Sequence, residues 1–403
     1  MEFKKVKLGE IIKVQIDNRG RNPEKYINYS KFPVIDNYLI KNEKYPNIKN
    51  VNRYIDEDTK NNFLRGHLEK DDVIITLVGN GIGNVTMVPS SKCVIIQNTL
   101  GLRCNELMTN DFLYYTLISN RNKIVKYNRG SSQPSIRKTD LFSYEINVPT
   151  INYQKKITKI LNSLDSKIEI NNKIISNLES QAQAIFKSWF VDFEPFQDGD
   201  FVESELGMIP EGWEVKELGE IINLYDNKRV PISKMDRDKM EKNYPYYGAN
   251  GIIDYVDNYL FDGKYLLMGE DGTVRTEEGF PILNYVDEKF WVSNHAHIMR
   301  GTLVSTEYIY LLLSKMFINN IVTGAVQEKI NQRNLKGIKI IFPEKKELES
   351  FEKIIEPMFK MKLYLNNQNT KLAELRDALL PKLMAGEIDV SDIKIEGEEV
   401  KNE

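Results

Sequence analysis

A stretch of the chain between Asp111 and Asp140 carries basic side chains and no acidic one, with Tyr127, Asn128 and Gln133 among them. The basic residues of this stretch are Arg121, Lys123, Lys126, Arg129, Arg137 and Lys138. Lysine and arginine neutralise phosphates, and a local excess of them is the electrostatic signature of a nucleic-acid surface. This segment therefore predicts contact with a phosphate backbone.

A second segment, residues 308–340, has the same bias. It contains Glu328 as its single acidic residue. Its basic residues are Lys315, Lys329, Arg333, Lys336 and Lys339. Two separate parts of the chain are thus suited to phosphate contact.

Phosphate contacts give affinity, whereas base identity is read by Arg, Lys, Asn and Gln side chains placed in a groove. Residues of suitable type in the basic segments or in predicted loops are the candidate DNA contacts. In the first half of the chain they are Arg19, Arg21, Asn80, Lys126, Arg129, Gln133, Arg137 and Lys138. In the second half they are Lys228, Arg229, Arg275, Asn294, His295, Gln327, Lys329, Arg333 and Lys336. Ordinary solvated surface is the alternative for any one of them.

Motifs for catalysis are missing. Gly79, Gly81 and Gly83 lack the spacing of a dinucleotide-binding loop, and no Walker-type Gly-Lys-Ser/Thr sequence occurs. These glycines fit a hairpin turn instead. Asn22-Pro23 is followed by glutamate rather than by a second proline, so the methyltransferase pattern is broken. We expect no catalytic residue and no cofactor in this chain.

Metal and thiol chemistry are also not indicated. His295 and His297 could face the same side of a strand, but no acidic or cysteine partner follows at ligand spacing, so no metal is expected. Cys93 and Cys104 are the only cysteines, too few for a disulfide framework, which fits a reducing compartment.

Composition is that of an ordinary folded protein, with 41% hydrophobic and 28% charged residues. A length of 403 residues suggests about two to four structural units. The net charge of −3 does not by itself indicate nucleic-acid binding, so local charge must decide. Because neither a secretory signal nor a run of about 18 apolar residues occurs, we expect a cytoplasmic protein that spans no membrane.

The chain repeats itself. Residues 8–12 and 218–222 both read Leu-Gly-Glu-Ile-Ile. Residues 130–136, Gly-Ser-Ser-Gln-Pro-Ser-Ile, recur at 324–330 as Gly-Ala-Val-Gln-Glu-Lys-Ile. Each copy has a globular part, then a proline, then a long helical pattern. The sequence therefore predicts a tandem duplication with a shared framework.

Both long patterns have a heptad seam with one polar position, Asn171 in the first and Gln368 in the second. The apolar seam positions are Ile157, Leu161, Leu164, Ile168, Ile175, Leu178, Ala182, Ile185, Trp189, Ile354, Met358, Met361, Leu365, Leu372, Leu375 and Leu379. Two seams predict a mutual pair of helices, each on the order of 50 Å long. The polar residues either fix the register or are tolerated at the seam edge. Pro357 would interrupt the second helix, which could begin only there.

The globular parts are predicted to be α+β. In the first copy, residues 72–78 and 84–88 have the pattern of two strands joined by the glycine turn, and 93–102 supplies another strand. In the second copy, residues 265–268 and 290–292 have comparable patterns.

Three stretches carry a resemblance to a known family. They are the run from Gln181 to Phe193, the entrance Gly207-Met-Ile-Pro-Glu-Gly-Trp-Glu214, and Leu375-Arg-Asp-Ala-Leu-Leu380 leading to Leu383-Met-Ala-Gly386. In these stretches the sequence resembles the specificity subunits of type I restriction–modification systems, and the likeness covers nearly the whole chain. The first copy departs from the pattern, because Met1-Glu-Phe-Lys lacks the Pro-Glu-Gly-Trp entrance.

The resemblance implies two target-recognition domains, each reading one half of a split DNA sequence, and two long helices that form an antiparallel coiled coil. It further implies two modification subunits that use S-adenosylmethionine to methylate adenine, and restriction subunits that use ATP and Mg. These cofactors would belong to the partner subunits. The recognition domains of this family diverge rapidly, so no contact residue is carried over from it.

The expected fold is therefore α+β with a pseudo-two-fold internal repeat. Its expected segments are recognition domain 1 at 1–150, long helix 1 at 151–192, a linker and recognition domain 2 at 193–343, long helix 2 at 344–386, and an acidic tail at 387–403. The alternatives are a coiled-coil scaffold that binds only proteins and a self-contained DNA methyltransferase or nuclease.

Overall fold

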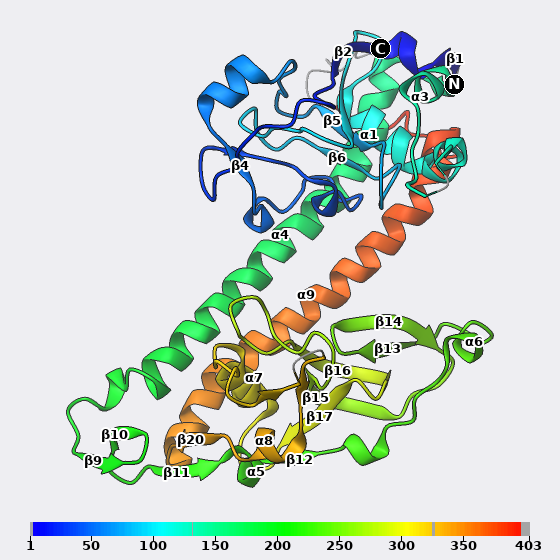
Figure 1. Cartoon of the computed structure of the whole chain (residues 1–403). Helices are drawn as coiled ribbons and strands as arrows, with labels where there is room; N and C mark the ends of the chain where they lie inside the picture. Colours follow the sequence, from blue (N-terminus) through cyan, green and yellow to red (C-terminus); the bar gives the residue numbers. More distant parts are fainter. Residues whose placement is uncertain (1–2, 131, 325–326, 396–403) are drawn as a thin grey trace. The chain divides into compact units, whose positions relative to one another are not determined.

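The computed structural model describes residues 3–130, 132–324 and 327–395. The chain divides into two compact units, one formed by Met1–Ile170 with Asn369–Glu403 and the other by Asn171–Gln368. Each unit contains one globular part and a portion of each of two long helices, α4 (Ile151–Phe190) and α9 (Lys345–Ala385) (Figure 1). Residues 396–403 of the expected acidic tail lie outside the described residues.

The first unit is built on a four-stranded antiparallel sheet. Its order is β2 (Ile12–Ile16), β7 (Thr99–Cys104), β5 (Val73–Thr76), β6 (Val85–Met87). The shorter elements are β1 (Lys4–Lys7) paired with β8 (Glu145–Val148), β3 (Phe32–Pro33) paired with β4 (Tyr54–Ile55), α1 (Asn110–Ser119), α2 (Arg121–Ile124), α3 (Lys138–Ser143), η1 (Leu8–Ile11), η2 (Asn37–Leu39), η3 (Ile48–Asn50), η4 (Thr59–Phe63) and η5 (Val125–Tyr127). The antiparallel pairing of β5 with β6 confirms the hairpin predicted at the glycines.

Central strand β5 is buried on both faces. Val73 and Ile75 pack in the same core cluster as Phe112 of α1, whereas Ile74 packs with Ile35 on the other face. This follows from the alternation of side chains along a strand. It also explains why β5 reads as a continuous apolar run in the sequence.

The second unit has a six-stranded sheet. Its order is β12 (Ile222–Leu224), β17 (Ala296–Gly301), β15 (Phe261–Gly269), β16 (Leu283–Val292), β13 (Tyr244–Gly248), β14 (Gly251–Val256), and only the β13–β16 pair is parallel. The other elements are β9 (Phe201–Ser204) paired with β10 (Gly207–Pro210), β11 (Glu214–Glu217) paired with β20 (Lys339–Phe342), β18 (Val322–Thr323) paired with β19 (Lys329–Ile330), α5 (Leu218–Ile221), α6 (Lys234–Arg237), α7 (Thr306–Ser314), α8 (Gln332–Lys336), η6 (Glu194–Phe196) and η7 (Asp226–Lys228).

The internal repeat is confirmed by the order of elements. Strands β2, β7, β5 and β6 correspond to β12, β17, β15 and β16, and the β1–β8 pair corresponds to β11–β20. The shared Leu-Gly-Glu-Ile sequence forms a short helix before the first sheet strand in both units. The second unit adds β13 and β14 at the far edge of its sheet. The fold is α+β with a duplicated framework, as predicted.

The long helices run antiparallel to each other within each unit. In the first unit, Asp165 of α4 pairs with Arg376 of α9 at 2.8 Å. In the second unit, the Asn171 amide donates to the Gln368 side-chain oxygen at 2.8 Å, and Asn171 is fully buried. The two polar seam residues therefore bond to each other, which is the register-fixing role rather than the edge position.

The seam predicted for the second helix needs correction. Ile354, Met361 and Leu375 are exposed, whereas Phe351 and Ile355 are buried. For Ile354 and Met361 the reason is that the first part of α9 packs against the globular core of the second unit, so its buried face follows that core and not only α4. Near Leu375, the last part of α9 instead buries Leu380 and Leu383 in the core of the first unit. The interruption expected at Pro357 was also wrong, because α9 is continuous from Lys345. No helix among the described residues is long and apolar enough to cross a membrane.

Each globular part is fastened to the helices differently. In the first unit the Tyr115 hydroxyl of α1 donates to Asp165 at 2.6 Å, and Asp165 accepts from Arg376. In the second unit aromatic rings fill the junction, where Phe190 lies 4.8 Å from Phe351 between ring centroids. Polar bonds therefore hold this junction in the first unit, and packed aromatic rings hold it in the second.

Candidate nucleic-acid interface

In the first unit, backbone hydrogen bonds join three loops at the end of the sheet where β5 finishes and β7 begins. The Leu77 amide, directly after β5, donates to the carbonyl of Asn98, directly before β7, at 2.7 Å. The Ile136 amide donates to the Leu77 carbonyl at 2.8 Å. The Gly79 amide donates to the Pro134 carbonyl, also at 2.8 Å. The glycine turn, the loop before β7 and the segment at 134–136 therefore meet.

The second unit repeats these bonds at equivalent positions. The Glu270 amide, directly after β15, donates to the His295 carbonyl, directly before β17, at 2.9 Å. The Ile330 amide donates to the Glu270 carbonyl at 2.9 Å. The Gly272 amide donates to the Glu328 carbonyl at 3.0 Å. Both units thus have the same three-loop frame, which we call the loop edge.

The Gly-x-x-Gln sequence that recurs along the chain has its described residues, Gly130 with Gln133 and Gly324 with Gln327, in the third loop of each edge. A Cβ atom on Gly130 would be 1.8 Å from the Gln133 carbonyl oxygen, and one on Gly324 would be 2.1 Å from the Gln327 carbonyl oxygen. A side chain does not fit in that space, so both positions require glycine. The side chains of Gln133 and Gln327 are exposed.

Three basic candidates of the first unit are paired with carboxylates. The Arg19 guanidinium donates to both oxygens of Asp17, at 2.8 and 2.7 Å, and Lys138 lies 3.5 Å from the same carboxylate. The hydrogen bond from Arg19 lowers the pKa of Asp17 to about 2, so this pair is charged at neutral pH. Arg129 donates one hydrogen bond of 2.9 Å to Asp140 and lies 2.8 Å from the other oxygen of that carboxylate. The charge of these side chains is partly neutralised within the unit.

The other candidates of the first unit are more available. Exposed candidates without an ion pair among the described residues are Asn80, Lys126, Gln133 and Arg137. A Cβ on Gly79 would lie 3.9 Å from the Gln133 amide nitrogen, so Gln133 and the glycine turn that carries Asn80 are neighbours. Arg21 is partly exposed and lies over the ring of Phe63 at 5.7 Å.

In the second unit, Arg229 is placed inside the loop edge and not on its surface. Its side chain is 14% exposed, and its guanidinium bonds to Glu270 and to the carbonyls of Asn294 and Ala296, at 3.2 and 2.9 Å for the two carbonyls. A guanidinium so occupied has few donors left for a base. Arg229 therefore positions the loop that carries Asn294.

Other charged candidates of the second unit are paired. Arg275 bonds to both oxygens of Glu328, and this hydrogen bonding lowers the pKa of the carboxyl group. The His295 ring nitrogen Nδ1 lies 2.6 Å from Asp271. Lys329 lies 3.5 Å from the Glu270 carboxylate.

The remaining candidates of the second unit are exposed. They are Lys228, Asn294, Gln327, Arg333 and Lys336. Lys228 lies over the ring of Tyr225 at 5.2 Å. Lys336 lies against Gly219 of α5. Because α5 precedes β12, Lys336 lies at the end of β12 that is opposite to the loop edge. The structure therefore does not bring Lys336 together with the other candidates.

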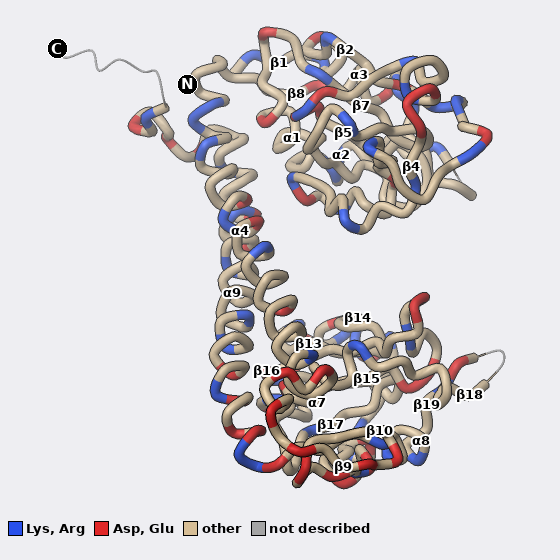
Figure 2. Tube along the Cα trace, turned by 90° about the vertical axis from the view of Figure 1, so that its left-hand side faces the viewer, with Lys and Arg blue, Asp and Glu red and all other residues tan. Residues whose placement is uncertain are grey.

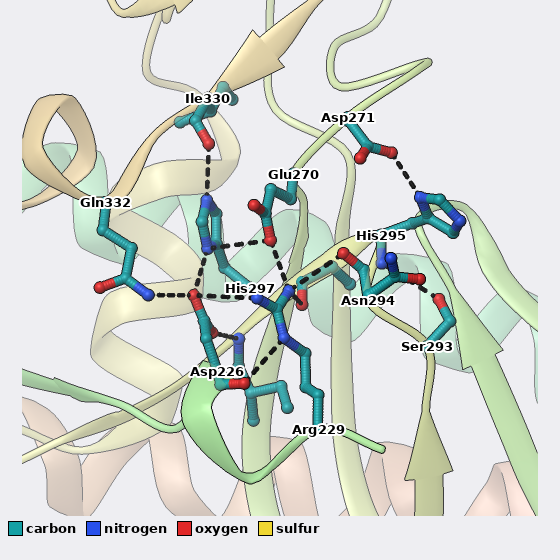
Figure 3. Close-up of polar contacts among 12 residues, drawn as sticks. Asp226, Arg229, Glu270, Asp271, Ser293, Asn294, His295, His297, Ile330 and Gln332 are labelled. Atoms are coloured by element: carbon teal, nitrogen blue, oxygen red, sulfur yellow. Dashed lines mark hydrogen bonds and ion pairs between the residues drawn. The ribbon is translucent and has the colours of Figure 1, made fainter. Parts of the chain in front are cut away.

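A buried polar network lies beneath the loop edge of the second unit (Figure 3). His297 is fully buried, with Nδ1 at 2.6 Å from Asp226 and Nε2 at 2.8 Å from the Ile330 carbonyl. Asp226 also accepts from the Ile298 amide at 2.9 Å and from the Gln332 side chain at 2.7 Å. The network ties the segment after β12 to β17 and to β19.

The reason given above for excluding a metal at His297 is wrong, because Asp226 and Glu270 come beside it from distant parts of the chain. Hydrogen bonding nevertheless speaks against a metal. Burial raises the pKa of Asp226, but the bonds and charge of His297, the bond from the Ile298 amide and the charge of Arg229 together hold it below its ordinary value. Both ring nitrogens of His297 are already engaged within the protein, Nδ1 by Asp226 at 2.6 Å and Nε2 by the Ile330 carbonyl at 2.8 Å.

In the first unit a neutral buried residue, Asn18, follows β2 and is 1% exposed. Its amide nitrogen donates to the carbonyls of Gly66 and Ile95, at 3.0 and 2.9 Å. Its oxygen accepts from the amides of Arg65 and Gly66, both at 3.0 Å. All four bonds go to the backbone, so Asn18 fixes the loops without a charge.

Sequence reasoning missed both of these anchors, Asn18 and Asp226. One signal was available, since each is a short polar residue that closely follows the repeated Leu-Gly-Glu-Ile-Ile sequence and an apolar strand. Their partners, in contrast, are too distant in sequence to be recognised.

Charge is not segregated onto a single face. Lys and Arg are intermixed with Asp and Glu over each unit (Figure 2). Since several basic candidates are paired internally, affinity for a polyanion would depend on the exposed subset rather than on a uniformly positive surface.

Comparison with known proteins identifies the framework. A family model described as the type I restriction modification DNA specificity domain matches residues 1–180 and 210–375. The MjaIX type I restriction enzyme specificity subunit of Methanocaldococcus jannaschii is 29% identical over 284 residues, which are 66% of this chain and 65% of that protein. The HindI specificity subunit of Haemophilus influenzae is 23% identical over 80% of this chain and 87% of its own length.

A solved structure shares the fold. The crystal structure of the type I restriction–modification S subunit from M. genitalium covers 95% of this chain and 96% of its own, with a TM-score of 0.56 and 16% sequence identity. The family match spans both copies of the repeat, and the duplicated frame is the one found in the S subunit. The chain therefore belongs to the family of type I restriction–modification specificity subunits, the non-catalytic DNA-recognition subunits of those systems.

Proposed function

We propose that each loop edge reads one half of a bipartite DNA sequence. The observation that carries this proposal is the repeat of the same three backbone hydrogen bonds under different side chains. Directly after the equivalent glycines the first edge carries Asn80 and the second carries Thr273, and Pro134 of the first edge corresponds to Glu328 of the second. An unchanged frame with changed side chains is what two half-sites of different sequence require.

The proposal divides the chain into working segments. Recognition domain 1 is residues 1–150, recognition domain 2 follows the linker within 193–343, and residues 151–192 and 344–386 are the spacer helices. At 1.5 Å per residue, the 40 residues of α4 would span about 60 Å, longer than the 34–36 Å of one DNA turn. The two half-sites would then be separated by base pairs that are not read.

Among the candidate contacts, we assign the surface role to the exposed residues without an internal ion pair. These are Asn80, Lys126, Gln133, Arg137, Lys228, Asn294, Gln327 and Arg333. Arg19, Arg129, Lys138, Arg275, His295 and Lys329 would reach DNA only in competition with their present carboxylate partners. Phosphates can compete, since charge-assisted bonds to Arg and Lys are strong.

The helices are proposed to dock two modification subunits, and restriction subunits would join the same complex. Exposed apolar side chains on the helices support a protein-binding role, including Ile170, Ile174, Met361, Tyr364 and Leu375. S-adenosylmethionine, ATP and Mg would be bound by those partners and not by this chain. The complex would act on DNA in the cytoplasm.

Selection from a random duplex library tests the proposal. The purified full chain, alone and with its modification subunits, should enrich two short sequence blocks separated by a constant number of unread positions. Removing one heptad from both helices should shorten the gap by about three base pairs, since seven residues rise about 10 Å. Enrichment of one continuous block, or none, would refute the bipartite reading. Methyl transfer from labelled S-adenosylmethionine by the chain alone would refute the non-catalytic role.

A further inference from the structure

The loop that enters the last strand of the sheet carries a carboxamide at the same position in both units. Gln97 lies two residues before β7, and Asn294 lies two residues before β17. The next residue in each case, Asn98 or His295, has the carbonyl that accepts from the amide following β5 or β15. Gln97 and Asn294 are therefore equivalent, although nothing in the local sequence aligns them.

Gln97 is exposed, and its orientation is set by a neighbouring loop. Its amide nitrogen donates to the side-chain oxygen of Asn22 at 2.6 Å. Asn22 comes from the loop after β2 that also carries Arg19 and Arg21. Among the described residues this is the only hydrogen bond of the Gln97 side chain, so one N–H and the carbonyl oxygen stay available.

Asn294 is held through its backbone and not through its side chain. Its carbonyl accepts from Arg229 at 3.2 Å, the next amide is bonded to the Ser293 hydroxyl at 3.2 Å, and the His295 ring is bonded to Asp271 (Figure 3). The side chain of Asn294 is exposed and makes no hydrogen bond within the described part of the chain. Because its backbone is fixed and its side-chain amide is unused, Asn294 is preorganised to form hydrogen bonds with a ligand.

A carboxamide presents one donor and one acceptor side by side. In the major groove this pair complements adenine, whose N6 amino group donates and whose N7 accepts, and Gln and Asn read adenine in this bidentate way. Guanine, with two acceptors there, does not match an amide.

We propose that Gln97 and Asn294 are specificity-determining residues, each reading one adenine–thymine base pair in its half of the target. This inference rests on the proposed function, because it assigns a role to single side chains of the same two loop edges.

The test uses the full chain with its modification subunits in selection from a random duplex library, comparing wild type with Gln97→Ala and Asn294→Ala. Gln15→Ala on β2 and Asn223→Ala on β12 are matched controls, because both are exposed amide residues on the first sheet strand of their unit. Gln97→Ala should lose an adenine preference of roughly 5- to 150-fold at one position of one block. Asn294→Ala should do so only in the other block, and the controls should keep both.

Gln97→Glu gives a second readout that a merely structural role would not produce. Glutamate only accepts, so it should favour cytosine, whose N4 amino group donates, at the position where wild type selects adenine. Unchanged preferences at the other positions of the same block show that the substituted unit is folded, and the unchanged second block shows the same for the other unit. Retention of every base preference by Gln97→Ala and Asn294→Ala, or a uniform loss over all positions, would overturn the inference. If the wild-type chain enriches no bipartite sequence, the proposed function itself fails, which is a distinct outcome.

Discussion

The two loop edges share the same backbone hydrogen bonds, but the buried residue that anchors the neighbouring loops is neutral in the first unit and charged in the second. In the first unit the neutral Asn18 makes four bonds to backbone groups and holds Ile95, two residues before Gln97. In the second unit the ionised Asp226 bonds to His297 and to the Ile298 amide, and so holds the strand that follows Asn294. The first unit therefore relies on a neutral amide as its anchor, and the second unit relies on a buried carboxylate.

This difference predicts which unit is more sensitive to pH and to substitution of its anchor residue. A neutral anchor is indifferent to pH and loses only hydrogen bonds when removed. A buried charged anchor leaves an uncompensated charge when one partner is lost, which costs more. We therefore expect the two units to respond unequally to matched substitutions.

The largest effect is expected for Asp226→Ala. Removing the carboxylate leaves the buried His297 without its partner and should lower the free energy of unfolding of the second unit by about 3–5 kcal/mol. All three tryptophans, Trp189, Trp213 and Trp291, belong to this unit. Urea unfolding followed by tryptophan fluorescence thus reports on it directly. A midpoint equal to that of wild type would show that the network is not stabilising.

A smaller loss is expected for Asn18→Ala, about 2 kcal/mol, because the unpaired backbone groups are neutral and some are only partly buried. Hydrogen exchange should speed up at the Arg65 and Gly66 amides. The tryptophan-monitored transition should stay unchanged, since the first unit contains no tryptophan. Unchanged exchange at both amides would remove the anchor role from Asn18.

The pH dependence should separate the anchors further. The pKa of Asp226 lies below its ordinary value, so its stabilising contribution is complete above about pH 4 and is lost as pH falls through the lowered folded-state pKa. The difference in urea midpoint between wild type and Asp226→Asn should be constant from pH 7 to 5 and should shrink below pH 4. A difference that grows on acidification would contradict the ionised assignment.

The smallest effect is expected for Arg229→Lys. Lysine keeps the charge but loses the fork that bonds Glu270 and two carbonyls, so Asn294 should be held less firmly. Preference at the second half-site should weaken by about 1 kcal/mol, with the first half-site unchanged. Arg300→Lys on β17, where the guanidinium lies over Tyr265, is the matched control. Equal losses in both half-sites would mean that Arg229 contacts phosphate instead.

Much of the framework could be predicted from the sequence, because it depends on local periodicity. The heptad seams gave both long helices, the repeated Leu-Gly-Glu-Ile-Ile marked the entrance to each sheet, and the apolar runs gave β5 and β15. The Gly-x-x-Gln motif located one loop of each edge. These signals arise from neighbouring residues, so a single chain displays them.

The candidate contacts were predicted less well. Arg229 was taken for a surface residue but is enclosed, Lys336 lies at the other end of its strand, and Arg129 is already paired with Asp140. Residue type predicts what a side chain can bind but not which partner reaches it first. That depends on groups that the fold brings near.

By itself the sequence determined the duplication, the helices and the absence of the recognised catalytic motifs, because each of these depends on the spacing of residues along the chain. Only the tertiary structure decided that Gln97 matches Asn294, that Asn171 meets Gln368 and that Asp226 lies beside His297. Those pairings join residues 71 to 197 positions apart. They depend on strand register and helix packing, which are properties of the folded chain as a whole.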